Sequence, residues 1–204
     1  MPGYEALRDA IVRGEIGPNA RLVEADVSQS FAMSRGAVRT ALVRLEQEGL
    51  VVREPNRGAR VRHIGDEEAV EILQARAALE GLAARQAAER IDAEGAERLR
   101  ACLARHGELV EAGDLLAASD ANATLHATLL ELSRHRIAQQ LIRGLRSQTV
   151  RFQFRTILVP GRPKASHAEH RAIVEAVVDG RADDAERAMR AHLLSVAAVL
   201  MPRP

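Results

Sequence analysis

The sequence predicts a mainly α-helical protein: three helices and a β-hairpin come first, and an all-α antiparallel bundle of about six helices follows. Two observations support this prediction. Apolar residues recur at the 3.6-residue helical period along most of the chain, and β-type runs occur only near residues 50–63. Ala, Leu, Arg and Glu, which are strong helix formers, are abundant throughout. Because the pattern changes near residue 64, we expect two domains, residues 1–64 and 65–204.

The first 64 residues contain three amphipathic segments before the β-type runs. Residues 4–13 and 24–31 each have an apolar helical face, and Ser34 is a favourable N-cap for a third helix that ends at Gly49. The third segment has its apolar residues at i, i+3, i+4 and i+7, namely Val38, Ala41, Leu42 and Leu45. Residues 50–54 and 59–63 flank Pro-Asn-Arg-Gly, which predicts a hairpin.

After this hairpin the sequence shows helical periodicity only. Asp66, Glu67 and Glu68 place acidic groups at a helix start, where they interact favourably with the helix dipole. Gly113, the Pro-Gly-Arg-Pro stretch at 160–163 and Gly180 separate later segments. The expected helices are 66–90, 93–112, 114–133, 136–157, 164–179 and 181–200.

Composition restricts the class of protein. The chain has 204 residues, 47% hydrophobic and 28% charged, as in folded globular proteins. No apolar run approaches the ~20 residues that span a membrane, and the opening MPGYEALRDA lacks the apolar core of a secretory signal. Cys102 is the only cysteine, which excludes an internal disulfide and fits a reducing compartment. We therefore expect a cytoplasmic protein with no membrane partner.

Three helices followed by a hairpin are the elements of a winged helix-turn-helix. In this motif the second of the two helices joined by the turn enters the major groove of DNA. The net charge of +1 is low for a nucleic-acid binder, but residues 34–62 hold seven arginines against three acids. Local charge governs phosphate contacts. Aromatic residues make up 2% of the chain, so duplex DNA is a better partner than a single strand. The candidate DNA-binding residues are Ser34, Arg35, Arg39, Thr40, Arg57 and Gly58.

The stretch SRGAVRTALVRLEQEGLV and the wing RGARV resemble the DNA-binding domain of the GntR family of bacterial transcription regulators, over nearly all of residues 4–64. The resemblance implies that Arg35, Arg39 and Gly58 contact operator DNA. Many members carry a DNA-contacting Arg early in the second helix, where this chain has Glu24 and Ala25, so that contact does not carry over. Regulators of this kind read pseudo-palindromic operators as homodimers.

Three histidines on three expected helices share faces with apolar residues: His126, His170 and His192. Burying three imidazoles without partners is costly, and a shared divalent ion would remove that cost. On spacing alone, ordinary core or surface histidines remain the simpler interpretation. For His63, His106 and His135 we expect no special role.

The spans DANATLHATLLELSRHRIAQQL and SHAEHRAIVEAVVDGRADDAERAMRAHL are similar to the FCD effector domain of the FadR-type branch of GntR regulators. In many members one Asp and three His hold a divalent ion, and these positions correspond to Asn122, His126, His170 and His192. The resemblance thus implies an ion of the Zn, Ni or Mn type. Because Asn122 replaces the Asp, weaker metal binding, or anion binding by the histidines alone, is the alternative.

The segment EILQARAALEGLAARQAA also matches this branch, where an Arg at the position of Arg76 often meets a ligand carboxylate. A guanidinium can bind a carboxylate in a bidentate manner. An ion pair with Glu80, one turn later, is an equal alternative. His167 lies one turn before His170 and is expected, at most, to line the effector site.

These observations favour a ligand-responsive transcription regulator that senses a small organic acid. The alternative is a DNA-binding regulator whose effector site is vestigial and metal-free. A metal-dependent hydrolase is a remote third possibility, because the chain has no H-E-x-x-H motif and Glu169 should point away from its neighbour His170. We therefore expect that the protein is not an enzyme.

Overall fold

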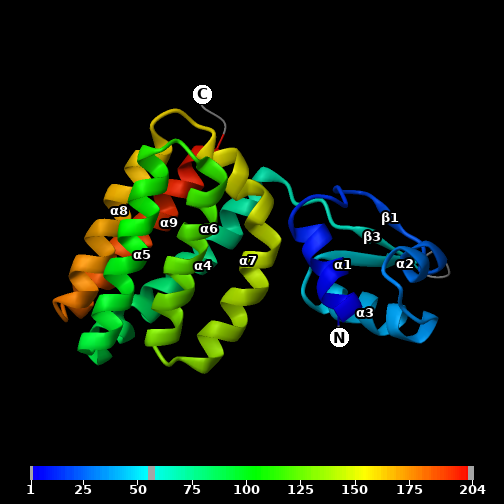
Figure 1. The fold of residues 1–204 in the computed structure, drawn as a ribbon, viewed down its shortest axis with the longest axis horizontal. Coiled ribbons are helices and arrows are strands. Elements are labelled where there is room, and N and C mark those ends of the chain that lie inside the picture. The colour runs from blue at the N-terminus through cyan, green and yellow to red at the C-terminus, as the bar shows by residue number, and fades with distance from the viewer. Residues whose placement is uncertain (1, 55–57, 202–204) are drawn as a thin grey trace. The chain divides into compact units, whose positions relative to one another are not determined.

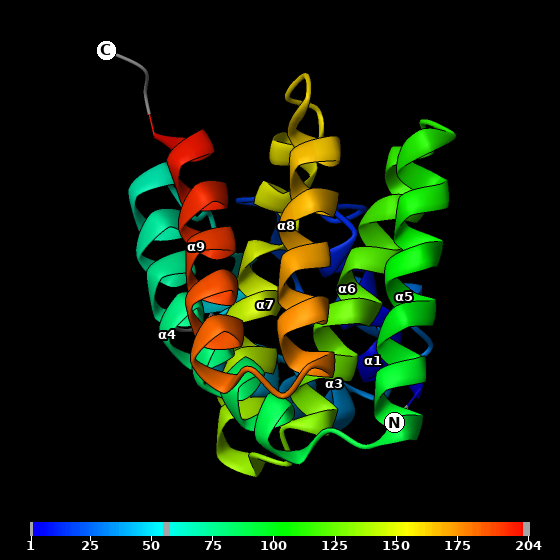
Figure 2. The same ribbon diagram turned by 90° about the vertical axis from the view of Figure 1, so that its left-hand side faces the viewer.

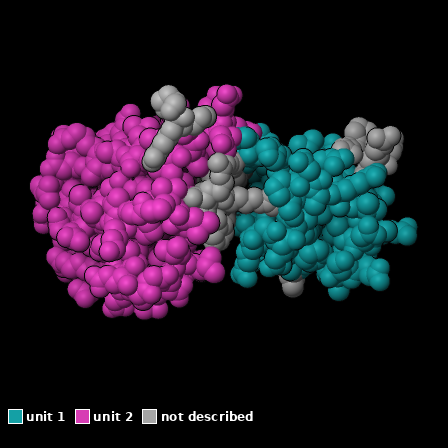
Figure 3. Space-filling view, turned by 90° about the horizontal axis from the view of Figure 1, so that it is seen from above, with its two compact units in different colours: residues 1–65, 144–151 teal, residues 66–143, 152–204 magenta. Residues whose placement is uncertain are grey.

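The structure is a computed structural model that describes residues 2–54 and 58–201 (Figure 1). The chain forms two compact units: residues 1–65 with 144–151 make unit 1, and residues 66–143 with 152–204 make unit 2 (Figure 3). Among the described helices, none has a stretch that is both long and apolar enough to cross a bilayer.

Unit 1 contains the three expected helices and the expected hairpin, together with one further strand. Its elements are α1 (Pro2–Val12), β1 (Arg21–Leu22), α2 (Glu24–Ser30), α3 (Arg35–Gln47), β2 (Val51–Glu54) and β3 (Gly58–Val61). The strands form an antiparallel sheet in the order β1-β3-β2, in which Val51 pairs with Val61 and Arg21 with Arg60. Strand β1 has only two residues, too few for its sequence to show an alternating pattern.

The core of unit 1 lies between the helices and the sheet. Ser34 caps α3, because its Oγ accepts the N–H of Ala37 at 3.2 Å. The four apolar residues of the α3 stripe are buried as predicted. They pack against α1, α2 and the sheet in one cluster that includes Leu7, Ile11, Val27, Leu22 and Val61. The exposed surface of α3 is therefore mostly polar, with Val43 as its exposed large apolar side chain.

The six helices expected after residue 64 are all present. They are α4 (Asp66–Arg90), α5 (Ala93–Glu111), α6 (Leu115–Leu132), α7 (Arg136–Ile157), α8 (Arg162–Val178) and α9 (Ala182–Leu200). They make up unit 2, except that residues 144–151 of α7 group with unit 1. The largest difference from prediction is the start of α8, which begins at Arg162 rather than near 164. Gly161 adopts φ +80°, and Pro163 falls in the first turn, where its missing N–H costs nothing.

The helices of unit 2 pack with α4 against α9, α5 against α6, and α8 against both α9 and α5 (Figure 2). Helix α7 joins through Ala138 and Ile142, which pack with Ala83 and Leu130. Apolar side chains fill most of the interior, but four histidines, two arginines and Glu80 are buried there too. Those polar residues come from α4, α5, α6, α8 and α9.

Candidate functional site

The outward face of α3 presents arginines at its N-terminal end. Arg35 and Arg39 are exposed, and 70% of the Arg39 side chain is accessible. Arg39 Nε donates to Glu24 Oε2 on α2 at 2.9 Å. Exposed ion pairs are weak, so this contact orients the guanidinium but can be replaced by a contact with DNA. The face can thus offer two guanidinium groups to base edges or phosphates.

The other candidate DNA-binding residues have local structural roles. The Ser34 hydroxyl caps α3, and the Thr40 hydroxyl donates to the carbonyl of Gly36 at 3.1 Å, although both side chains remain exposed. Gly58 has φ +84°, and a Cβ there would lie 2.3 Å from the carbonyl oxygen of Leu22. Strand β1 therefore lies too close to Gly58 to leave room for a side chain. Arg57 lies outside the described residues.

The three predicted histidines converge in the core of unit 2. Nε2 of His170 on α8 lies 3.2 Å from Nε2 of His126 on α6 and 3.2 Å from Nε2 of His192 on α9. Their ligand atoms all lie within 4.8 Å of one another. Nitrogen ligands around a tetrahedral Zn²⁺ are separated by about 3.3 Å, since each Zn–N bond is about 2.0–2.1 Å. We call these three residues the histidine centre.

His126 and His192, the two outer rings on either side of His170, each form a hydrogen bond to a carboxylate. His126 Nδ1 lies 2.6 Å from Glu80 Oε2, and Glu80 Oε1 accepts from Arg76 Nε at 2.7 Å. His192 Nδ1 lies 2.7 Å from Glu169 Oε2. Glu169 also accepts two bonds from the Arg162 guanidinium and one from the Ser195 hydroxyl. The Nδ1 atom of each outer histidine thus contacts a glutamate that is itself paired with an arginine.

These carboxylates determine where the ring protons lie. A carboxylate only accepts, so Nδ1 of His126 and of His192 must donate, and Nε2 of each neutral ring carries a lone pair. One proton on His170 Nε2 can satisfy only one of those two lone pairs well. A cation shared by the three nitrogens would use all of them, and metal-bound histidines commonly donate their other N–H to a carboxylate. The residues therefore fit a divalent ion.

Two buried polar atoms near this arrangement have no hydrogen-bond partner in the described part of the chain: Nδ1 of His170 and Oδ1 of Asn122. Asn122 lies one turn before His126 on α6 and so shares its face. Its free amide oxygen has the chemistry of a fourth, neutral ligand. Buried acceptors without partners are costly, which is consistent with a site that is completed by another group.

Burial favours the neutral form of two of the three imidazoles. It lowers the pKa of His170 well below its ordinary value, helped by the neighbouring His192 and His126. It also lowers the pKa of His192, although the bond to Glu169 opposes this shift. For Glu169, burial acts to raise the pKa, but bonds from His192 and Arg162 outweigh it and lower the pKa to about 2. The shifts thus favour neutral rings at His170 and His192 and an ionised carboxylate at Glu169.

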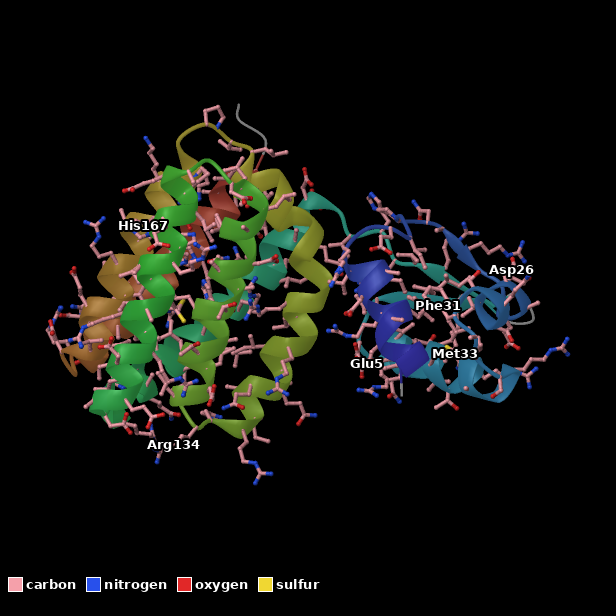
Figure 4. All side chains as sticks on the ribbon, in the orientation of Figure 1. Glu5, Asp26, Phe31, Met33, Arg134 and His167 are labelled. Carbon is pink, nitrogen blue, oxygen red and sulfur yellow. The ribbon has the colours of Figure 1, made fainter. Side chains whose placement is uncertain are left out.

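A second histidine pair adjoins the centre. The ring of His106 on α5 lies edge-on to His170, with the ring centroids 5.1 Å apart. Its Nδ1 is 3.3 Å from Nδ1 of His167 on α8, the residue that Figure 4 labels. Burial lowers the pKa of His106 to about 4. A Cβ at Gly107 would lie 2.8 Å from the His167 ring, so this glycine makes room for the pair.

The structure thus brings together His126, His170 and His192, with Asn122 on the same helix face as His126. It pairs Arg76 with Glu80, which is one of the two expected alternatives. Sequence reasoning missed Glu80 as a partner of His126, and it missed Glu169, Arg162 and His106. No short-range pattern in the sequence signals the role of His106. His135 has a structural role, since its Nδ1 caps α7 by accepting the N–H of Ala138.

Comparison with known proteins assigns the two segments. The FCD domain family matches residues 71–195, and the bacterial regulatory proteins of the gntR family match residues 4–61. The HTH-type transcriptional repressor RspR of Escherichia coli (strain K12) is 28% identical over 193 residues, which cover 95% of this chain and 85% of RspR.

Solved structures share the whole fold. Escherichia coli McbR/YncC matches with a TM-score of 0.82 at 20% identity, and a GntR transcriptional regulator from Rhodococcus sp. RHA1 with a TM-score of 0.74 at 24% identity. Each match covers 97% of this chain and 94% of the other. The winged helix-turn-helix followed by an all-α domain is thereby confirmed.

Proposed function

Since the chain is a bacterial transcription regulator of the GntR family that carries an FCD domain, we propose that it binds a pseudo-palindromic operator as a homodimer and responds to a small organic acid. Residues 1–64 form the DNA-binding domain in this proposal. Residues 65–204 form the domain that binds the effector and makes the dimer. The acid binds at the histidine centre together with a divalent ion of the Zn, Ni or Mn type.

One observation carries the effector part of the proposal. Three Nε2 atoms converge in the core, while the opposite nitrogens of the two outer rings are fixed by Glu80 and Glu169. Neutral imidazoles with this support are typical ligands of a divalent ion. His126, His170 and His192 would hold the ion, with the Asn122 amide oxygen as a fourth ligand. The ion, when bound, supplies a Lewis-acidic position at which a carboxylate can bind.

The chain's own residues define what enters this site. The Arg76 guanidinium, which contacts Glu80, is one candidate for a second contact with an acid group. His167, which pairs with His106, is the other candidate lining residue. Hydrolysis has little support, because Glu169, the obvious general base, is held by three donors.

The DNA part of the proposal rests on α3. Arg35 and Arg39 lie in its first turns on the exposed face, where a guanidinium can contact the O6 and N7 atoms of guanine. Ser34, Thr40, Arg57 and Gly58 complete the proposed DNA-binding set through phosphate and backbone contacts. An effector changes operator affinity only if it binds the DNA-competent and incompetent states unequally.

The test combines elemental analysis with operator binding. Purified wild-type chain should contain a divalent metal, and a His192→Ala variant should lack it, whereas His63→Ala, on an exposed ring, should retain it. Gel shifts on the operator should then respond to at least one small carboxylate in the wild type but not in His192→Ala. A metal-free wild type, with no carboxylate changing operator affinity or melting temperature, would mean that the effector site is vestigial.

A further inference from the structure

The charges around the histidine centre cancel before any ion enters. Arg76 contacts Glu80, and Arg162 contacts Glu169 in a bidentate manner. Each carboxylate that supports an outer histidine is therefore already balanced by its own guanidinium. Neither carboxylate is left to neutralise a positive charge placed between the rings.

The inner ligand set is also neutral. It consists of three imidazoles, which coordinate only in the neutral form, and the amide oxygen of Asn122. His170 is completely buried, and His126 and His192 are 2% and 4% exposed. A divalent ion at this position brings two positive charges into the core, where no side chain of the set compensates them. An uncompensated buried charge is strongly unfavourable.

We propose that the centre binds its divalent ion and an organic anion interdependently, because Asn122 supplies a neutral ligand where a carboxylate would supply a charge. This inference rests on the proposed function, since it takes the histidine centre as the effector site. The anion provides the negative charge that the ligand set of the protein lacks. A dicarboxylate should consequently couple to the ion more strongly than a monocarboxylate of similar size.

The coupling has a regulatory consequence. By linkage, an anion that raises the affinity for the ion is itself bound more tightly when the ion is present, by the same factor. Neither component alone occupies the centre fully. The regulator would thus respond to the coincidence of metal and acid, and its sensitivity to the acid would follow the supply of the metal.

The experiment measures Zn²⁺ affinity by calorimetry on the full chain after metal removal, with free zinc set by a competing chelator. Titrations without anion, with acetate and with succinate should give successively lower Kd values in the wild type. We expect a change of about fivefold or more with succinate. Asn122→Asp should bind zinc tightly without any anion and show a much smaller response.

Asn19→Asp is the matched control. It adds the same charge at an exposed position in unit 1 whose positive φ an aspartate also tolerates, and it should behave as the wild type. Equal zinc affinity with and without anions in the wild type would overturn the coupling but leave the metal site intact. Binding by Asn122→Asp alone, even with succinate present, would also overturn it. If neither protein binds zinc, the metal part of the proposed function fails as well.

Discussion

The buried pair of Arg76 and Glu80 allows a sharp test of how the histidine centre is held. Glu80 is 2% exposed and accepts from two donors, Arg76 Nε at 2.7 Å and His126 Nδ1 at 2.6 Å. Glu80→Gln keeps the shape but removes the charge and leaves one accepting oxygen for two donors. Breaking a buried ion pair costs about 3–5 kcal/mol. This corresponds to a decrease of about 10² to 10⁴ in the ratio of folded to unfolded protein.

Urea unfolding of the metal-free chain, followed by far-UV circular dichroism, measures this loss in the transition of unit 2. With a slope of about 2 kcal/mol per molar urea, the midpoint should fall by about 2 M. Glu131→Gln breaks an exposed pair with Arg98 in the same unit and should change the midpoint little. Arg76→Met combined with Glu80→Gln should recover part of the loss. Equal losses in Glu80→Gln and Glu131→Gln would refute the reasoning.

Acid should destabilise the metal-free bundle, because burial lowers the pKa of His106 from 6.5 to about 4. Above the pKa of His106 in the unfolded chain, the ring is neutral in both states and costs no stability. As the pH falls towards the pKa in the folded chain, only the unfolded chain takes up the proton, so stability is lost. About 2 kcal/mol should disappear between about pH 7 and pH 5, and an unchanged pH dependence of the urea midpoint in His106→Asn would contradict this. Arg39→Ala should abolish specific operator binding in gel shifts without changing the melting temperature, whereas Arg187→Ala, equally exposed in the bundle, should leave binding intact; retained affinity in the former would exclude α3 as the recognition helix. Gly58→Ala should lower the melting temperature more than Gly14→Ala, because both glycines have positive φ but only at Gly58 would a Cβ lie 2.3 Å from a carbonyl oxygen; similar losses would contradict that steric argument.

The elements of the fold could be predicted from sequence because local chemistry determines their boundaries. Ser34 caps α3 as expected, and Asp92 and Asp114 cap α5 and α6 in the same way. Strand β1 could not be predicted, because it exists only through its pairing with β3. Arg21 pairs with Arg60, thirty-nine positions away in the printed sequence, and no short-range pattern signals such a partner.

For the site, helical spacing predicted that His126, His170 and His192 turn inward. It did not predict the carboxylates that bond to the Nδ1 atoms of the two outer rings, which are those of Glu80 and Glu169. The expectation that Glu169 points away from its neighbour His170 followed from the angle of about 100° between adjacent helical residues. In the structure Glu169 bonds to His192 on α9, which is itself a member of the histidine centre. That contact depends on how α8 and α9 pack together. His106 was missed for the same reason, since its partners lie on α8.

The length of α4 gives the contact between Glu80 and His126 a mechanical consequence. The helix runs without interruption from Asp66 to Arg90, and Gly65, the last residue of unit 1 before it, immediately precedes its first turn. Glu80 lies fourteen residues from that start, which is about 21 Å along the axis. A displacement of Glu80 when the histidine centre is occupied would therefore act on a helix that continues without a break back to the residue after Gly65.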